Sequence, residues 1–286
     1  MSVYIIIFIQ QLIGSGTHIV TKVMVGDVDP ITLTTMRSLI AAIGFLLFAY
    51  IRKINFRFDR KDYLLLIVLS VVAIYFNQFV FMYSLKFTTP ANASLLYATT
   101  PTMVLILSSI FFREKLTLKK SLGIGVALIG ILLVVFDRRI GLSSKYTIGN
   151  LMLISAVISW AIYTVFGKRL ILKYGAFKTS AATLIIGAVL YLPLGCFSIF
   201  DFDYSKLTTM DFGGILYLGL GTSIFGYSLW YYAIGKIDTS KVAIFSNLQP
   251  VLTTVFSVIL LGQTITPIFV VGGLIAIIGV ILTQFG

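Results

Sequence analysis

Apolar residues in this chain come in long runs of about 20 residues, and these runs constrain the fold more than any other feature. A helix of that length crosses the hydrocarbon core of a bilayer, and a helix that is apolar all round has no face for water. The chain is 58% hydrophobic and only 11% charged, which excludes a soluble protein of this length. We expect ten transmembrane spans, at residues 3–25, 31–51, 63–85, 91–112, 119–136, 148–171, 178–200, 211–234, 240–261 and 266–285.

The links between these runs are short, so the sequence predicts an all-α integral membrane domain without a separate soluble part. The N-terminus lacks a basic segment and a small-residue cleavage site, so its apolar run is expected to be the first span and not a signal peptide. Cys196, the only cysteine, lies within a predicted span and supports no disulfide.

The basic residues predict how the chain is oriented. The formal net charge is +12, but nearly all Lys and Arg residues lie in the links, as the positive-inside rule expects, and this argues against a nucleic-acid partner. With the N-terminus inside, the inner loops hold 15 Lys and Arg residues and the outer loops hold 6. We therefore expect both termini on the cytoplasmic side of a cytoplasmic membrane, with the lipid bilayer as a partner. The sequence does not determine the number of subunits.

The two halves of the chain repeat each other. A shift of 149 residues aligns spans 3–5 with spans 8–10 without a gap. The aligned pairs include Phe76 with Phe225, Pro101 with Pro250, Gly123 with Gly272, Ala127 with Ala276, and Gly130 with Gly279. The first copy carries the charged stretch "FFREKLTLKK", whereas the second carries the uncharged "LLGQTITPIF".

An odd number of spans in each half explains this loss of charge. The second half then enters the membrane inverted, and positive charge is kept only on the cytoplasmic copy. The sequence thus predicts ten transmembrane helices in two inverted five-helix repeats, over residues 1–137 and 148–286, which together form one membrane domain. Inverted repeats of this kind are typical of transporters that rock one half against the other around a site at the membrane midplane.

The stretches "ANASLLYATTPTMVLILSSIFFREKLTLKKSLGIGVALIGILLV" and "KVAIFSNLQPVLTTVFSVILLGQTITPIFVVGGLIAIIGVIL" resemble the two EamA repeats of the drug/metabolite transporter superfamily. The resemblance covers essentially the whole chain and implies ten helices, an inverted five-plus-five layout and export of a small metabolite such as an amino acid. Two departures, Gln263 in place of a usual Glu and "LIGSG" in place of a common Trp-Gly, weaken any argument for one inherited substrate.

The first span carries a polar stripe at helical spacing, formed by Gln10, Gly14, Thr17 and His18. Polar side chains within a span face the bundle interior or a water-filled cavity. The stripe is therefore either a wall of a substrate cavity or a set of hydrogen bonds between helices.

Arg37 lies several residues inside the second span, where a charged side chain costs about 3 kcal/mol on insertion scales. Something must offset that cost. Arg37 either meets the carboxylate of a substrate or reaches to Asp27 or Asp29 at the outer end of the span.

Pro101 and Pro250 lie in the middle of spans 4 and 9, where each removes a backbone N–H and frees a carbonyl one turn back. Paired breaks in inverted repeats point to a central site, although two kinks that only shape packing are the alternative. The polar residues near the breaks are candidates for substrate binding: Tyr97, Thr100, Ser246, Asn247 and Gln249.

Spans 3, 6 and 8 add further polar and aromatic residues, which are either cavity walls or ordinary packing. The candidates among them are Asn77, Gln78, Trp160, Tyr163, Tyr227 and Trp230. In spans 5 and 10, by contrast, the small-residue faces Gly123–Ala127–Gly130 and Gly272–Ala276–Gly279 are assigned to close helix packing, not to a substrate.

All ten acidic residues lie at span ends or in links, so the sequence offers no buried carboxylate for sodium or for a proton relay. It also has no P-loop, no HExxH motif and no cysteine cluster, which argues against an enzyme and against a metal or other cofactor. We expect a secondary transporter that exports amino acids or related zwitterions by alternating access. A multidrug or aromatic-cation exporter and a flippase for lipid-linked head groups remain alternatives.

Overall fold

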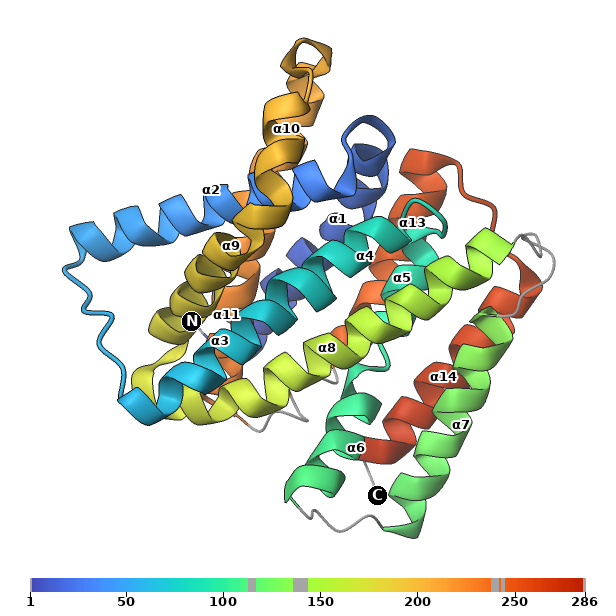
Figure 1. Cartoon of the computed structure of the whole chain (residues 1–286). Coiled ribbons are helices and arrows are strands. Elements are labelled where there is room, and N and C mark those ends of the chain that lie inside the picture. Colours follow the sequence, from blue (N-terminus) through green and yellow to red (C-terminus); the bar gives the residue numbers. More distant parts are fainter. Residues whose placement is uncertain (1, 113–116, 136–143, 238–241, 243–244, 285–286) are drawn as a thin grey trace.

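A computed structural model describes residues 2–112, 117–135, 144–237, 242 and 245–284. Within these ranges the chain is helical apart from short links, and it contains no strand. Figure 1 shows a bundle of long helices that cross one another at varied angles, coloured along the chain.

The first half supplies five helical segments. They are α1 (Val3–Asp27), α2 (Pro30–Ile51), a rod made of η1 (Arg60–Asp62), α3 (Tyr63–Val71), η2 (Val72–Phe79) and α4 (Val80–Ser84), a broken segment made of α5 (Pro90–Tyr97) and α6 (Thr100–Phe112), and α7 (Leu118–Val135).

The second half follows the same order. Its segments are α8 (Ser144–Tyr174), α9 (Ala176–Asp201), the turn η4 (Tyr204–Lys206), a rod made of α10 (Thr209–Leu216), η5 (Tyr217–Gly226) and α11 (Tyr227–Ile234), then η6 (Phe245–Asn247) with α13 (Leu248–Leu261), and α14 (Pro267–Gln284).

Eight of these helical segments are long and apolar enough to cross a membrane, and two shorter apolar helices, Phe245–Leu261 and Pro267–Thr283, complete the described set. Large apolar side chains such as Phe197, Phe200 and Leu118 are exposed on the outside of the bundle, where lipid would cover them. The chain is therefore a multi-pass membrane protein. The count of ten spans and the side on which the termini lie stay predictions.

The break in span 4 begins a new helix instead of bending an old one. α5 ends at Tyr97, α6 begins at Thr100, and Pro101 occupies the first turn of α6, where a missing N–H costs little. The carbonyl oxygen of Tyr97 accepts a hydrogen bond from Thr100 Oγ1 at 2.6 Å, so it is satisfied within the chain. Span 9 is built in the same way, because the 3₁₀ turn η6 precedes α13 and Pro250 lies in its first turn.

Spans 3 and 8 share a second irregularity, the π-helical segments η2 and η5. Such segments accommodate an extra residue per turn and are frequent at functional sites. In η5 the hydroxyl of Ser223 donates to the carbonyl of Leu218, five residues back, at 3.0 Å. One face of each segment is buried in the bundle, and Asn77, Gln78 and Thr222 from these faces reappear in the cavity described below.

The small-residue faces of α7 and α14 pack against each other, as the sequence predicts. A Cβ atom added at Gly130 would lie 2.6 Å from the carbonyl oxygen of Gly272, and one added at Gly279 would lie 2.6 Å from the Cα of Ala127. Gly123 lies against Thr283, whereas Gly130 lies against Gly272, so the two helices run antiparallel. Figure 1 shows the pair side by side, with α14 in red and α7 in green.

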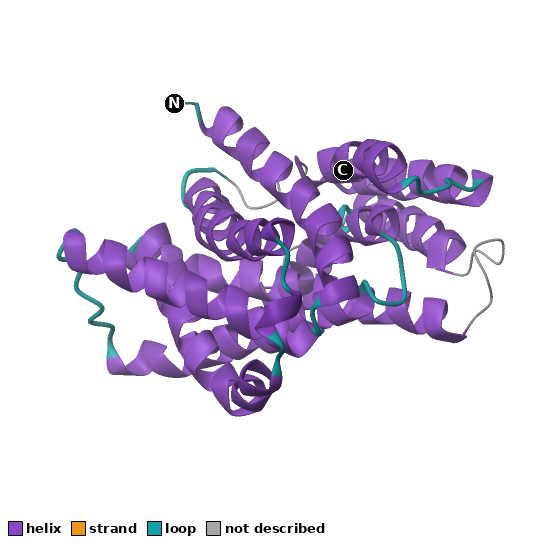
Figure 2. Ribbon diagram, turned by 90° about the horizontal axis from the view of Figure 1, so that it is seen from above, coloured by secondary structure: helices purple, strands orange, loops and turns teal. Residues whose placement is uncertain are grey.

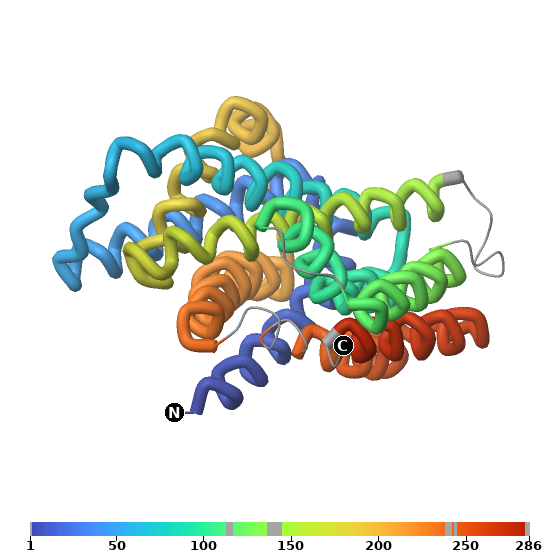
Figure 3. Tube along the Cα trace, turned by 90° about the horizontal axis from the view of Figure 1, so that it is seen from below, coloured from blue at the N-terminus to red at the C-terminus, as the bar shows by residue number. Residues whose placement is uncertain are grey.

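The helix α1 runs through the middle of the molecule and contacts α13, η5, α11 and α5. Figure 3 shows α1, in dark blue, running from the N-terminus at the edge into the bundle, with the red α14 on one side and the blue α2 on the other, and Figure 2 shows this N-terminal helix from the opposite face. Two apolar clusters fill the bundle at the two ends of this helix, one around Phe45 and Tyr163 that includes Ile7, and the other around Leu33 and Leu153 that includes Met24. The polar stripe of α1 lies between them.

Candidate functional site

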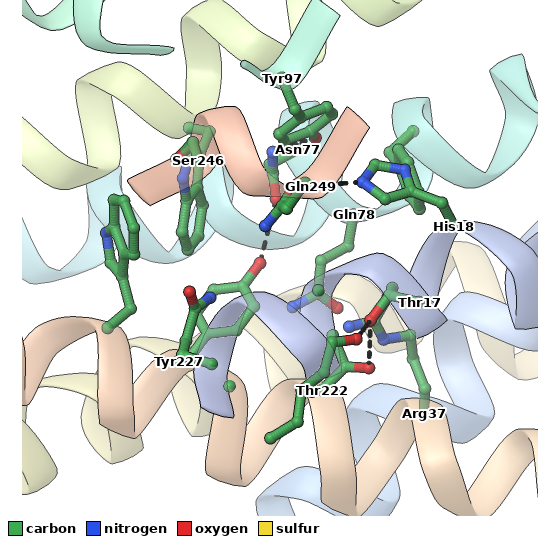
Figure 4. Close-up of a pocket in the computed structure, with 17 residues that line it drawn as sticks. Thr17, His18, Arg37, Asn77, Gln78, Tyr97, Thr222, Tyr227, Ser246 and Gln249 are labelled. Atoms are coloured by element: carbon green, nitrogen blue, oxygen red, sulfur yellow. Dashed lines mark hydrogen bonds between the residues drawn. The ribbon is translucent and has the colours of Figure 1, made fainter. Parts of the chain in front are cut away.

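A central cavity opens between α1, α2, the two π-helical segments and the two helix breaks. It holds about 640 Å³ of space that no atom fills, its open side included. Its walls come from both halves of the chain, and seventeen residues line it (Figure 4): Gln10, Ile13, Gly14, Thr17, His18, Arg37, Asn77, Gln78, Phe81, Tyr97, Trp160, Thr222, Gly226, Tyr227, Trp230, Ser246 and Gln249.

The structure gathers most of the residues that the sequence nominated for substrate binding into this one cavity. Those that line it are Gln10, Gly14, Thr17, His18, Arg37, Asn77, Gln78, Tyr97, Trp160, Tyr227, Trp230, Ser246 and Gln249. Whether these side chains bind a substrate is a proposal taken up below.

Three nominated residues do not line the cavity. The hydroxyl of Thr100 is occupied by the carbonyl of Tyr97. Tyr163 is fully buried, and its hydroxyl lies 2.8 Å from the hydroxyl of Thr183. Asn247 sits at the start of α13 and is also absent from the lining. These three residues lie outside the lining, and whether they contact a substrate stays a prediction.

Four lining residues were not nominated from the sequence: Ile13, Phe81, Thr222 and Gly226. The 149-residue shift would have found two of them. It pairs Phe81 with Trp230 and Gly226 with Asn77, and both of those partners were nominated. Thr222 aligns with an alanine, and Ile13 is apolar, so neither carried a signal.

Among the described residues that line the cavity, Arg37 is the only charged one, and it is 2% exposed. Its Nε and Nη2 atoms both donate to the hydroxyl oxygen of Ser223, at 3.1 Å and 2.9 Å. It forms no ion pair with any residue in the described ranges. Asp29 instead caps α2 through the N–H of Ile31 at 2.8 Å and pairs with Lys86 at 3.6 Å. The expected alternative of an Arg37 side chain reaching to the outer-end carboxylates is therefore wrong.

The two amides of η2 differ in their surroundings. Asn77 donates to the hydroxyl of Tyr97 at 2.8 Å and to the carbonyl of Ala156 at 3.0 Å, and it accepts from the hydroxyl of Tyr227 at 3.0 Å. Gln78 is 2% exposed and lies against the Tyr227 hydroxyl, yet neither of its amide atoms makes a hydrogen bond of normal geometry to a described residue. A buried polar group without a partner is costly, so the Gln78 amide is a position where a ligand atom would be stabilising.

His18 lies on the other side of the cavity from the π-helical segment η5. Its Nε2 is 3.4 Å from Gln249 Oε1, and its ring contacts the rings of Phe81 and Tyr97 edge-on, with centroids 5.2 Å and 5.6 Å away. Gly14 lets the Gln249 side chain cross over α1, because a Cβ at this position would lie 3.1 Å from Gln249 Cδ. The His18 ring is therefore enclosed by its own neighbours.

Aromatic rings form a further wall of the cavity. Trp160 meets Tyr227 edge-on at 5.0 Å and Trp230 at 5.6 Å, measured between ring centroids. Trp230 Nε1 donates to the hydroxyl of Thr164 at 3.2 Å, which fixes the orientation of its ring. Tyr163 stacks on Trp160 from behind at 5.7 Å, so it supports this wall without lining it. Such a wall suits an apolar or cationic group.

Taken together, the lining residues that the structure describes offer one cation, several amides and hydroxyls, and an aromatic wall, without a carboxylate. Within the described ranges no group of three or more His, Cys, Asp or Glu side chains could hold a metal ion. The arrangement suits binding of a small polar ligand with an apolar part, and the cavity lies at the level of the helix breaks.

Comparison with known proteins gives a consistent family. The model of the EamA-like transporter family matches residues 1–136 and 147–285. The uncharacterized transporter YyaM of Bacillus subtilis is 29% identical over 98% of this chain and 93% of its own length. A probable amino-acid metabolite efflux pump of Salmonella typhimurium is 28% identical over 94% of this chain and 90% of its own length, and one of Escherichia coli is 26% identical over 94% and 90%.

One solved crystal structure shares the fold. It superposes with a TM-score of 0.70 at 19% sequence identity, and the match covers 98% of this chain and 96% of the other.

Proposed function

The chain belongs to the EamA-like transporter family, and from this membership and the cavity we propose that it is a secondary transporter that exports small metabolites. Amino acids or related zwitterions are the proposed substrates, because two relatives are named as amino-acid metabolite efflux pumps. The observation that carries the proposal is the central cavity itself, which both halves line and which lies at two broken and two π-helical segments. The proposal assigns no enzymatic reaction and no cofactor to the chain.

An arrangement of two inverted five-helix repeats, over 1–137 and 148–286, is supported by the way the segments pair. In the first half, α5 and α6 pack on α8, and their equivalent in the second half, α13, packs on α1. In the same way, α2 packs on η5, and its equivalent α9 packs on α3 and η2. Three segments pack on their own counterparts: α2 on α9, α5 on α13 and α7 on α14. The antiparallel course of α7 and α14 is what an inversion of one repeat against the other requires.

The proposed mechanism is alternating access across the cytoplasmic membrane. Ten helices, with both termini in the cytoplasm, would place the cavity near the middle of the bilayer. Rocking of one repeat against the other would then open the cavity to one side at a time. The helix breaks and π-helical segments are the points at which the helices bend with least loss of hydrogen bonding.

The test is transport by the purified protein in liposomes. Preloaded vesicles should accumulate a labelled amino acid by exchange, and vesicles without protein should not. Failure to move any amino acid, amine or organic acid under an outward or inward gradient would refute the proposal. Within the described part of the lining there is a single cationic residue, which does not favour a flippase for lipid-linked head groups, and no carboxylate, which does not favour an aromatic-cation exporter.

A further inference from the structure

We propose that the cavity selects its ligand by a carboxylate group bound at Arg37, and that it accepts such a ligand whether or not the ligand also carries an ammonium group. This inference rests on the proposed function and narrows it. The ligands would be small monocarboxylates with an apolar part, of which amino acids are one case and their deaminated acids another.

The first observation is the unpaired charge of Arg37. The guanidinium group has five N–H donors, and two of its nitrogens share the single hydroxyl oxygen of Ser223. That hydroxyl is neutral, and it is itself engaged as a donor to the carbonyl of Leu218. A buried cation that lacks an anion is unfavourable, whereas a carboxylate can accept two parallel hydrogen bonds from the guanidinium fork. The cavity is thus short of one negative charge, and the ligand would supply it.

The second observation is the Gln78 amide. It is nine-tenths buried or more, its amide atoms lack hydrogen bonds of normal geometry within the described part of the chain, and it lines the same cavity. Figure 4 shows the Gln78 side chain between Tyr227 and the group formed by Arg37, Thr17 and Thr222. A carboxylate held at Arg37 could accept from the Gln78 amide as well, which would satisfy both groups at once.

Several other polar groups of the cavity are already engaged. The hydroxyls of Thr17 and Thr222 are 2.8 Å apart and hydrogen-bond to each other. Asn77 has two acceptors and one donor within hydrogen-bonding distance. His18 is enclosed by Phe81, Tyr97 and Gln249. His18 Nδ1 also lacks a partner, but among the described lining residues only Arg37 carries a charge, and the Gln78 amide lies beside it, so these two groups are the ones best suited to an anion.

An ammonium group finds no comparable partner. The described lining residues include no Asp or Glu, so only aromatic faces and neutral oxygens of these residues face such a group. The rings of Trp160, Tyr227 and Trp230 would attract a cation through their π faces, an interaction weaker than a buried ion pair. An ammonium group must also give up its water on entry. The attraction to the rings and the loss of hydration nearly cancel in the binding free energy of the ammonium group. The site should therefore distinguish ligands by their carboxylate alone.

The experiment measures binding of matched probes to the full chain in detergent. The probes are leucine, its deaminated acid 4-methylpentanoate, leucinamide, and the decarboxylated amine 3-methylbutylamine, with the phenylalanine series as a second set. Leucine and 4-methylpentanoate, or their aromatic counterparts, should bind within about threefold of each other. The amide and the amine should bind at least about 30-fold more weakly, as expected when one partner of a buried charge pair is lost.

Two variants connect this preference to the residue. Arg37→Gln should weaken binding of the acids about 30-fold and leave binding of the amine unchanged, so the preference for a carboxylate disappears. Lys22→Gln is the matched control. Lys22 lies on α1, donates to the carbonyls of Leu85 and Thr88 at 2.7 Å and 2.9 Å, and does not line the cavity. Its loss should leave the preference intact.

The outcomes separate this inference from the proposed function. If the amine or amide binds as tightly as the acid, or if Arg37→Gln retains the preference, the carboxylate assignment is overturned while export of small metabolites stands. If the amino acid binds at least tenfold more tightly than its deaminated acid, indifference to the ammonium group is overturned. If no probe of either series binds, the assignment and the amino-acid proposal fall together, and liposome transport of other solutes then decides the wider function.

Discussion

Arg37 and Asp62 are both buried charges, but the protein treats them differently. The Asp62 carboxylate, 1% exposed at the start of span 3, accepts from Lys173 Nζ at 2.5 Å, the Tyr174 hydroxyl at 2.6 Å and Arg169 Nη2 at 3.2 Å. Arg37 has one neutral hydroxyl. The comparison teaches that burial alone does not identify a functional charge. A charge whose counterions belong to the chain holds the structure together, whereas a charge without them is available to a ligand.

The Asp62 network also joins the two halves of the chain. Asp62 and Asp59 precede span 3 in the first half, while Arg169, Lys173 and Tyr174 end α8 in the second half. Lys173 bridges both carboxylates, and the N–H of Asp59 donates to the Tyr174 hydroxyl at 3.0 Å. If both termini lie in the cytoplasm, as proposed, this network lies at the cytoplasmic end of the bundle.

The largest effect on stability is expected from Asp62→Asn. The change leaves Lys173 and Arg169 facing a neutral amide, so the melting temperature in detergent should fall by about 5 °C or more. The preference for carboxylate ligands should not change. Asp203→Asn, at an exposed pair with Lys206 3.4 Å away, is the control and should shift the melting temperature by less than about 1 °C. Equal shifts in both variants would contradict a special role for Asp62.

Lys173→Gln should have a smaller effect, because Arg169 and Tyr174 still contact Asp62. We expect a fall in melting temperature of about 2–4 °C. The variant that combines Lys173→Gln with Asp62→Asn should melt close to Asp62→Asn alone, since both changes remove the same interaction. Additive shifts would mean that the two residues act independently.

Arg37→Gln should behave in the opposite way. Removing a buried charge that has no counterion should leave the melting temperature of the ligand-free protein within about 2 °C of the original, or raise it. A carboxylate ligand that stabilises the unaltered protein should no longer do so. A drop in melting temperature as large as that of Asp62→Asn would show that Arg37 is structural.

The smallest effect is expected from Lys86→Gln. Lys86 pairs with Asp29 at 3.6 Å, and both side chains are more than a third exposed. Water screens such a pair, so the melting temperature should change by less than about 1 °C. A larger shift would mean that the outer end of the bundle is held as firmly as the Asp62 network holds the other end.

The sequence predicted the cavity better than it predicted the partners within it. The stripe on α1 and the paired prolines led to His18, Tyr97 and Gln249, because helical spacing and chain breaks are local properties. The Ser223 partner of Arg37 was not predictable, because the π-helical geometry of η5 shifts the phase of its side chains. The same holds for the buried state of Asp62, since its partners lie more than a hundred residues away along the chain.

The fold, too, has features that could be predicted from local sequence and features that could not. Helix positions follow from apolar runs, and the small faces of α7 and α14 were correctly assigned to packing, because glycine spacing reports directly on how closely a helix can be approached. The direction of a single side chain at a break, as with Thr100, depends instead on which neighbour captures its hydroxyl.

The contact between α7 and α14 has a consequence for how such a chain must be made. Gly130 lies against Ala276, and Ala127 lies against Gly279, so one surface meets a second copy of itself. A gene that encoded only half of this chain would yield a product that needs a second molecule, threaded into the bilayer upside down, to cover its glycines. Joining both halves in one polypeptide lets the ribosome deliver the two orientations in a fixed ratio, in order, during a single round of synthesis.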